Sequence, residues 1–552
     1  MRFRTRHLLV ALGFILVAGL FAAPRAFASE LGDAIMLRIE FDEGSVWGDT
    51  GDARLIKVFE FYEHRQYEPI FVNEDGVNAK GKALVAALKD CASDGLTPAD
   101  YQTSELEAKL GVSDITGLAD LEIRLAKAMI AYGHDLSSGR LKPHKVDREL
   151  YIYPEGPGPA ALLRGAVVAD DLTAYLADLA PASPNYARLK QKLAEFRKIA
   201  AAGGWVHVPE GETLKPGMRN ERVKILRQRL LQSGHLKAED VPADVEQNAD
   251  LFDPALSRAV KIFQFRYGLD QDGAVGPKTL KALNVPVVER VKTMELNMER
   301  RRWMDDDLGE KYVFVNLADF WLKVVDGRHT IHTAPVVVGK TFHRTPVFSK
   351  DMKYIVFNPF WNVPRSIAVN EYLPKLRRDP GALLRQNIKL VSSSGVIDPY
   401  SIDWNSVSSK RFPFRLRQDS GKRNALGLLK FLFPNKHNVY IHDTPSKSLF
   451  SRTVRSFSHG CIRVKNPRDL AVVLLKGQGG WNEKKIKAAI ASGKRRIVRL
   501  EDPIPVHITY LTSWVNKDGT VYFRNDIYGR DKRLAKALQS SRILVQTSQN
   551  EN

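Results

Sequence analysis

The chain's 552 residues are enough for several domains, at least one of them with a large hydrophobic core. The formal net charge of +20 suits either an anionic partner or a solvated basic surface with no specific partner. Only two cysteines are present, with no C-x-x-C pair and no His/Cys/Asp cluster at ligand spacing, so the sequence implies no metal site, and we expect no cofactor.

Residues 1–28 have the features of a secretory signal peptide. Arg2, Arg4 and Arg6 precede an apolar run over residues 8–22, and small residues then stand at the two positions that a signal peptidase reads, Ala26 and Ala28. The alternative is an uncleaved anchor, but the run is short for a membrane span, and no later segment is apolar enough to cross a bilayer. We therefore expect an exported protein whose anionic partner is a wall polymer or a membrane surface, and no nucleic acid.

The pattern over residues 29–203 is mainly helical. Segments 81–92 and 118–136 are amphipathic, and each is followed by a glycine and then a proline. Cys91 lies on the apolar stripe of the first of these helices, so we assign it to packing and treat Cys461 as a free thiol. No chemistry is visible in this region.

A run of small residues at 200–204 predicts a domain boundary. Two helical stripes follow, formed by Val223, Leu226 and Leu230 and by Leu256, Val260 and Phe263. Residues 268–280, GLDQDGAVGPKTL, form a turn in which Pro277 suits the first turn of a third helix. A generic three-helix bundle would satisfy this pattern, but its ending resembles the peptidoglycan-binding domain of wall hydrolases and transpeptidases, which we place over residues 204–290.

A connecting helix is expected within residues 291–310, and we interpret its arginines at 300–302 as a solvated helix end. From residue 311 the period becomes strand-like, which indicates an antiparallel, β-rich domain over residues 311–535. Its expected parts are strands at 312–316, 320–325, 331–338 and 354–357, a hairpin at 505–531 and a frayed tail at 536–552.

Residues 365–415 form a long insertion in this β-rich region. The insertion has short helical pieces and becomes polar and irregular around residues 392–404. Long insertions in compact domains are commonly lids or disordered segments, and the pattern alone does not decide between them.

Cys461 lies in a Ser458-His459-Gly460-Cys461 turn. A thiol attacks only as thiolate, so it needs a neighbour that lowers its pKa or accepts its proton, and His459 and His442 are the available histidines. His442 precedes the cysteine by 19 residues and follows a strand-like run, which fits a strand, a loop and a return strand. Gly460 permits a tight turn with amides free to face an oxyanion. A lone cysteine is also commonly a small buried hydrophobe, and the residues alone leave both interpretations open.

The full pattern from His442 to Arg463 resembles the signature of the L,D-transpeptidases, in which a histidine is followed at this distance by Ser-His-Gly-Cys, an apolar residue and Arg or Asn. Ser420 departs from the expected proline. Further stretches resemble the large members of this family, at residues 94–101, 135–140, 339–346, 358–364, 417–435 and 526–531. The resemblance implies a multidomain α+β fold with a helical scaffold, a three-helix peptidoglycan-binding domain and a β-rich catalytic domain with a lid.

The resemblance also implies acyl transfer on peptidoglycan in the periplasm, with acylation of Cys461 by carbapenems. Cys461 would attack the third residue of a tetrapeptide stem and release D-alanine, and an amine of a neighbouring stem, usually on meso-diaminopimelate, would then form a 3→3 cross-link. The resemblance implies that His442 accepts the proton and that His459 orients the loop or shares the base role. Backbone amides at Gly460 and Cys461 would donate to the oxyanion, and Arg463 would contact a substrate carboxylate or support the oxyanion site. Tyr440 and Ser458 would line the groove, and Tyr400 and Trp404 would contact substrate from the lid.

Three alternatives remain. Water as the acceptor would make the protein an L,D-carboxypeptidase or hydrolase, and a lysine of an outer-membrane protein would make it an anchoring enzyme. A non-catalytic wall-binding protein is the third. Other wall-synthesis proteins are candidate peripheral partners.

Overall fold

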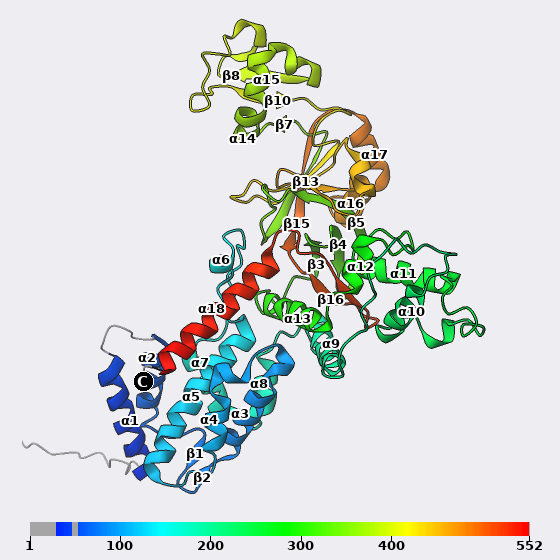
Figure 1. Cartoon of the computed structure of the whole chain (residues 1–552). Helices are drawn as coiled ribbons and strands as arrows, with labels where there is room; N and C mark the ends of the chain where they lie inside the picture. Colours follow the sequence, from blue (N-terminus) through cyan, green and yellow to red (C-terminus); the bar gives the residue numbers. More distant parts are fainter. Residues whose placement is uncertain (1–28, 47–52, 551–552) are drawn as a thin grey trace, which may run out of the picture. The chain divides into compact units, whose positions relative to one another are not determined.

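The computed structural model describes residues 29–46 and 53–550, so the signal peptide expected at residues 1–28 lies outside the described residues. The chain divides into two compact units, coloured along the sequence in Figure 1. One comprises Met1–Val85, Ser104–Ile130 and Pro159–Leu172, and the other comprises Ala86–Thr103, Ala131–Gly158 and Thr173–Asn552. In the described part of the chain, no helix combines the length and apolar character that a membrane span requires.

The smaller unit is helical, as expected for the scaffold region. Its centre holds a fully buried carboxylate, Glu122, which accepts hydrogen bonds from the Tyr62 hydroxyl and from the backbone N–H groups of Ile70, Phe71 and Val72. These donors satisfy a group that would otherwise be costly to bury. The elements of the scaffold region are α1 (Glu30–Val46), α2 (Ala53–His64), β1 (Val72–Asn73), β2 (Gly76–Val77), α3 (Ala79–Asp90), α4 (Thr103–Ala108), α5 (Ile115–Ser138), α7 (Pro159–Val168) and α8 (Leu172–Asp178). Most of α8 and the ends of α3 and α5 belong to the larger unit.

The larger unit includes the expected three-helix module, made of α10 (Arg222–Gln232), α11 (Pro254–Arg266) and α12 (Pro277–Leu283). Asp253 caps α11 because its side chain accepts a hydrogen bond of 2.9 Å from the Leu256 N–H. Both predicted stripes are buried in one core, at Val223, Leu226, Leu230, Leu256, Val260 and Phe263. The sequence pattern therefore identified the inward faces correctly.

Helices α9 (Pro184–Ala201) and α13 (Val287–Arg302) pack against each other. The expected solvated end of α13 is wrong, because Arg300 and Arg302 are buried. Arg302 forms an ion pair of 2.8 Å with Glu299, and Arg300 forms one of 2.6 Å with Asp531. The acidic partners offset the cost of burying these charges, and the partner of Arg300 comes from a distant segment that a helix-end pattern does not reveal.

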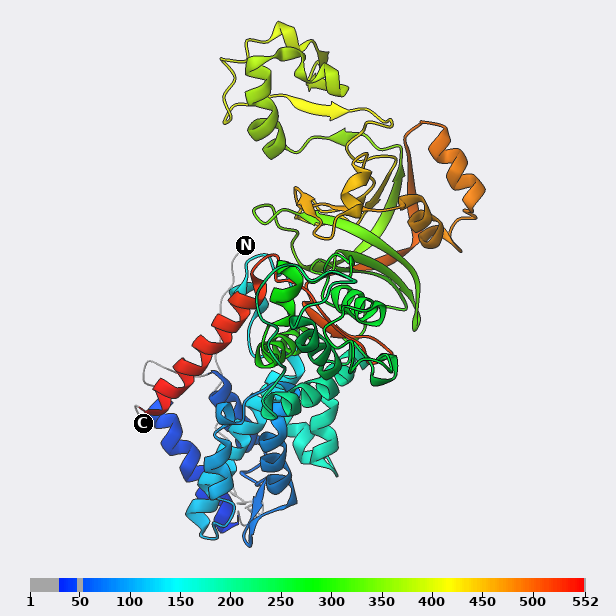
Figure 2. The same ribbon diagram turned by 45° about the vertical axis from the view of Figure 1, so that its right-hand side comes forward.

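A nine-stranded sheet forms the frame of the β-rich domain, in the order β13-β5-β14-β12-β11-β6-β15-β3-β4, and a further β4–β5 pairing curls it back on itself (Figure 2). The expectation of an antiparallel domain is wrong for three pairs, because β12–β14, β13–β5 and β15–β3 are parallel. The strands are β3 (Lys311–Asn316), β4 (Trp321–Asp326), β5 (His329–Gly339), β6 (Phe348–Phe357), β11 (Leu429–Leu432), β12 (Ile441–His442), β13 (Ser456–Ser458), β14 (Ile462–Val464) and β15 (Arg496–Thr509).

The long connections explain the parallel pairs, since a parallel neighbour needs a crossover rather than a tight turn. The chain between β12 and β14 supplies such a crossover and carries β13. Helices α16 (Pro467–Leu475) and α17 (Glu483–Ala491) follow and contribute buried residues to the core of this sheet.

The insertion at residues 365–415 has its own apolar core and a separate four-stranded sheet in the order β7-β10-β8-β9. In Figure 1 its elements form a group of their own. The sheet includes a hairpin, β8–β9, in the part expected to be irregular. The elements are β7 (Trp361–Asn362), α14 (Arg365–Ile367), a π-helical turn (Ala368–Tyr372), α15 (Leu373–Arg378), β8 (Ile388–Ser392), β9 (Gly395–Ile397) and β10 (Arg415–Gln418).

The C-terminal hairpin is present as β16 (Ser513–Val515) and β17 (Val521–Phe523). The expectation of a frayed tail at residues 536–552 is wrong for its described part, because α18 (Arg530–Asn550) is helical as far as residue 550. The polar composition of the tail favoured fraying, but the helix begins inside a buried ion-pair network at Arg530.

Candidate active site

The side chains expected to carry the chemistry share one face of the β12–β14 pair. The register aligns Ile441 with Ile462 and His442 with Arg463, and the Ile462 N–H donates to the Tyr440 carbonyl at 3.1 Å. Because side chains alternate along a strand, Tyr440, His442, Cys461 and Arg463 point to the face opposite the two buried isoleucines. The sheet thus brings the predicted nucleophile and the predicted base to one surface.

A cavity of about 660 Å³ opens on this face. It lies between the turn at residues 458–461, which we call the nucleophile turn after its expected role, the start of the insertion, and strands β11 and β12. Its polar lining includes His343, Asn362, Arg365, Asn370, Glu371, Lys430, His437, Asn438, Tyr440, His442, Ser458, His459, Cys461 and Arg463.

His442 is arranged to accept a proton. It is 5% exposed, and its Nδ1 lies within hydrogen-bond distance of the Asp443 carbonyl. A carbonyl can only accept, so Nδ1 carries the hydrogen and Nε2 is left with a lone pair. Burial, followed by the positive charge of Arg463, lowers the pKa of His442 to about 3, so the ring is neutral near pH 7.

The Cys461 thiol is free and half-buried. Its Sγ donates to the Asn438 carbonyl at 3.6 Å. Burial raises the pKa of Cys461, whereas hydrogen bonds from the Tyr440 backbone and side chain and the charges of Lys430 and Arg463 act in the opposite direction. The other cysteine, Cys91, is fully buried, in agreement with its assignment to packing.

The turn before Cys461 is closed by its own hydrogen bonds. The Gly460 N–H donates to the Ser458 hydroxyl at 3.1 Å, and that hydroxyl donates to the Cys461 carbonyl at 2.5 Å. Gly460 has a φ of 109°, which favours glycine. The expected oxyanion role of the Gly460 N–H is therefore not available in this geometry, and Ser458 braces the turn besides lining the cavity. For the Cys461 N–H the described residues offer no such internal acceptor.

The loop that follows β5 forms the outer support of this turn. The Lys340 N–H donates to the Ser458 carbonyl at 2.9 Å, and the Thr345 hydroxyl donates to the Gly460 carbonyl at 2.8 Å. The Tyr528 hydroxyl donates to the Gly339 carbonyl at 2.6 Å at the base of the loop. Sequence reasoning missed Thr345 and Tyr528 as supporting residues, although both lie in stretches that resemble the family.

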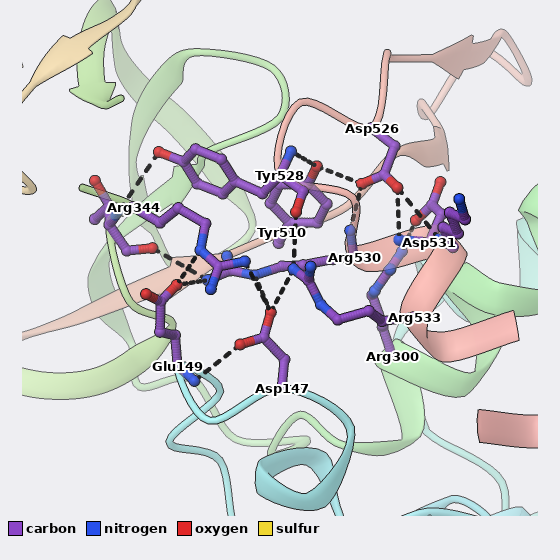
Figure 3. A network of polar contacts seen from close by, with 12 residues as sticks. Asp147, Glu149, Arg300, Arg344, Tyr510, Asp526, Tyr528, Arg530, Asp531 and Arg533 are labelled. Atoms are coloured by element: carbon purple, nitrogen blue, oxygen red, sulfur yellow. Dashed lines mark hydrogen bonds and ion pairs between the residues drawn. The ribbon is translucent and has the colours of Figure 1, made fainter. Parts of the chain in front are cut away.

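A buried ion-pair network anchors this loop (Figure 3). Asp147 is paired with Arg530 at 3.3 Å and with Arg533 at 2.7 Å, and Glu149 is paired with Arg344 at 2.8 Å. Arg530 also donates to the Thr345 carbonyl at 3.4 Å. Burial alone would raise the pKa of Asp147, but the Glu149 N–H and the three arginines outweigh it and hold that pKa below its usual range.

The side chain of His459 faces the insertion, whereas the residue expected to accept the proton of Cys461 is His442. Its Nε2 lies 2.6 Å from the Glu371 carboxylate, which belongs to the π-helical turn after α14. His459 thus joins the nucleophile turn to the insertion, and the geometry supports loop orientation over a share in the base role.

The two aromatic residues expected to contact the substrate are elsewhere. Trp404 is buried in the core of the insertion, where its Nε1 donates to the Pro399 carbonyl at 2.8 Å. Tyr400 is 63% exposed. Neither is among the described residues that line the cavity. The family resemblance implied lid contacts for both residues, but the small core of the insertion uses Trp404 for packing.

Lys430 is a cavity residue that sequence reasoning did not single out. It lies on β11 opposite His442, and its Nζ is 3.8 Å from the centre of the Tyr440 ring. A single lysine within the apolar run of residues 428–433, Leu-Leu-Lys-Phe-Leu-Phe, was the available signal, since apolar strands seldom carry one charge without a use.

Comparisons with known proteins agree with this geometry. Residues 57–193 match the scaffold domain family, residues 219–283 match the family described as "Putative peptidoglycan binding domain", and residues 310–487 match the L,D-transpeptidase catalytic domain. A relative from Haemophilus influenzae, named "Putative L,D-transpeptidase", is 36% identical over 242 residues, which are 44% of this chain and 48% of that protein. The chain spans about half the length of the curated relative that it matches.

Two solved structures are also similar. An L,D-transpeptidase from Xylanimonas cellulosilytica is 16% identical, with 54% of this chain and 98% of that chain covered and a TM-score of 0.16. An L,D-transpeptidase from Stackebrandtia nassauensis is 15% identical, with 57% and 98% covered and a TM-score of 0.20. These scores are too low to add to the structural argument. In chain order, the matched families are the scaffold domain, the peptidoglycan-binding domain and the L,D-transpeptidase catalytic domain, and the last match includes the paired strands β12 and β14.

Proposed function

We propose that the protein is an exported peptidoglycan L,D-transpeptidase that forms 3→3 cross-links through a thioester on Cys461. The observation that carries this proposal is the shared face of β12 and β14, where a free thiol and a neutral, buried imidazole line one cavity. The peptidoglycan-binding domain in the same chain supports a wall polymer as the substrate.

In the first half-reaction, the Cys461 sulfur attacks the carbonyl carbon of the third residue of a tetrapeptide stem. A sulfur–carbon bond forms, the thiol proton passes to His442 Nε2, and the carbonyl oxygen becomes an oxyanion beside the Cys461 N–H. The intermediate then collapses and the bond to D-alanine breaks. His442 returns the proton to the departing amine, so the ring ends neutral and the thioester remains.

In the second half-reaction, an amine on the third residue of a neighbouring stem attacks the thioester carbonyl. Its proton passes to His442 and then to the leaving sulfur, which restores the thiol and leaves an amide cross-link. Arg463 supports substrate positioning in this proposal, since its Nε is buried and has no hydrogen-bond partner among the described residues. A carboxylate of the stem peptide would satisfy that donor.

The test is incubation of the purified protein with disaccharide-tetrapeptide, followed by mass spectrometry of the products. We expect a dimer lighter than two substrates by one D-alanine. The Cys461→Ala variant should make no product, while the matched Cys91→Ala variant should still make it, because Cys91 only packs in a core.

The other outcomes separate the alternatives. Tripeptide without dimer would replace the cross-linking proposal with an L,D-carboxypeptidase. Absence of any product from the folded wild-type protein would overturn the proposal in favour of protein anchoring or wall binding. An intact-mass increase on incubation with a carbapenem, lost in Cys461→Ala, would support the thioester chemistry independently of the acceptor.

A further inference from the structure

Lys430 brings a positive charge to the reactive face of the sheet. Its register partner on β12 is His442, so its side chain leaves the sheet on the same side as Tyr440, Cys461 and Arg463. The ammonium lies over the Tyr440 ring, at 3.8 Å from the ring centre, and both Lys430 and the Tyr440 side chain act to lower the pKa of Cys461. The ring therefore holds the charge close to the nucleophile without neutralising it.

Neither cation on this face is neutralised by a carboxylate. Within the described ranges, no acidic side chain lies at ion-pair distance from Lys430 or Arg463. Among the described residues, the one acidic side chain that lines the cavity is Glu371, and it is paired with His459. The cavity thus holds two buried or half-buried cations that lack a negative partner, which is unfavourable unless an anion forms between them.

The remaining titratable groups do not remove this imbalance. Arg365 donates to the backbone carbonyls of Phe412, Ser409 and Lys410 and adds positive charge. The other groups facing the cavity are His343, His437, His459, Tyr440 and His442, none of which is an anion near pH 7. His442 is a neutral proton acceptor, so it does not supply the counter-charge for a thiolate. That role falls to Lys430 and Arg463.

We propose that Lys430, acting with Arg463, stabilises the negative charge that the Cys461 sulfur acquires when its thiol ionises. In the free protein the thiol proton passes to solvent, and during acyl transfer it passes to His442, so the two cations offset the charge on sulfur in both cases. The inference rests on Cys461 being the nucleophile of the proposed reaction. It does not depend on which stem or acceptor the protein uses.

The test measures the rate at which iodoacetamide alkylates Cys461 across a range of pH, with the labelled peptide identified by mass spectrometry. Iodoacetamide is uncharged and no wall substrate is present, so the midpoint reports ionisation of the thiol alone. The variants are Lys430→Met, which keeps the length of the side chain, Lys430→Arg, which keeps its charge, and Lys353→Met. Lys353 is an exposed lysine on β6, the strand that pairs with β11, and it serves as the matched control.

We expect the midpoint to rise by about one pH unit in Lys430→Met, which is a roughly tenfold loss of thiolate at a fixed pH below the midpoint. Lys430→Arg and Lys353→Met should keep the wild-type midpoint.

An unchanged midpoint in Lys430→Met would overturn the proposal, and a raised KM for wall substrate in that variant would then assign Lys430 to a substrate carboxylate. If Lys430→Met does not melt cooperatively, Lys430→Gln is the second neutral variant, with the same two outcomes. Failure of the proposed function would appear separately, as a normal alkylation profile in a protein that makes no product.

Discussion

The Thr345 hydroxyl donates a hydrogen bond of 2.8 Å to the carbonyl of Gly460, the residue immediately before Cys461. The same oxygen accepts the Gly339 N–H at 2.9 Å. Thr345 is fully buried, so neither bond competes with water. This side chain therefore ties the end of β5 to the turn that presents Cys461 and fixes the orientation of the Gly460–Cys461 peptide.

Replacing Thr345 with valine should lower kcat without a comparable change in KM. Valine has the same shape but no hydroxyl, so the Gly460 carbonyl and the Gly339 N–H each lose a buried partner, at about 1–3 kcal/mol. We expect a loss of kcat of about tenfold, as the oxyanion N–H of Cys461 becomes less well oriented. Thr345→Ser keeps the hydroxyl and should restore most of the rate in the dimer-forming assay. Equal kcat values in the valine and serine variants would remove Thr345 from this supporting role.

Replacing Asp147 with asparagine should destabilise the larger unit by about 3 kcal/mol at pH 7, because it leaves the buried Arg530 without its full charge partner. The folded-state pKa of Asp147 is lowered, so its contribution is present above the unfolded pKa of about 3.9 and is lost as pH falls through the folded pKa. Urea unfolding at several pH values should therefore show a difference between wild type and variant that is constant above about pH 5 and shrinks in acid.

The matched control for Asp147 is Glu155→Gln, which neutralises an exposed acid in the same segment of the chain. It should change the free energy of unfolding by less than about 0.5 kcal/mol. A difference between wild type and Asp147→Asn that persists unchanged at pH 3 would contradict an ionic origin.

The pH profile of acylation should lack a limb from His442. The pKa of His442 is about 3, so the ring is neutral throughout pH 5–8, and the rate should instead rise with pH as the Cys461 thiol ionises. His442→Gln should slow acylation by a factor of about 100 to 10,000. The exposed His329→Gln variant is the control and should match wild type. A limb near pH 6.5 that disappears in His442→Gln would show that the imidazole is charged in the resting protein.

Replacing Glu371 with glutamine should loosen the insertion while leaving global stability nearly unchanged. The His459–Glu371 pair is 2.6 Å long, but its side chains are 33% and 41% exposed, so water screens it and its contribution is at most about 1 kcal/mol. Hydrogen exchange should become faster in the segment Arg365–Tyr372 of the variant, with protection elsewhere retained. The same exchange rates in wild type and variant would mean that this pair does not restrain the insertion.

Local sequence was sufficient to predict much of the fold and the domain order of this protein. The helical stripes of the three-helix module depend only on apolar spacing within one helix, and the pattern from His442 to Arg463 lies within one short segment of the chain. The helical scaffold, the module and the β-rich catalytic domain were predicted in their correct order, and family models match the same regions. The strands at residues 320–325 and 331–338 were also predicted, and the structure pairs the corresponding strands β4 and β5 antiparallel.

Tertiary structure alone decided which residues meet. Lys430 reaches the site through its register with His442, Thr345 reaches Gly460 through a loop, and Asp147 reaches Arg530 across 383 positions of the chain. For the same reason the sequence did not reveal that Trp404 is a core residue or that the Gly460 N–H is hydrogen-bonded to the Ser458 hydroxyl. The spacing of apolar residues along the sequence indicates which side of its helix or strand a residue faces. Partners from distant segments, and the burial and charge they bring, exist only once the chain has folded.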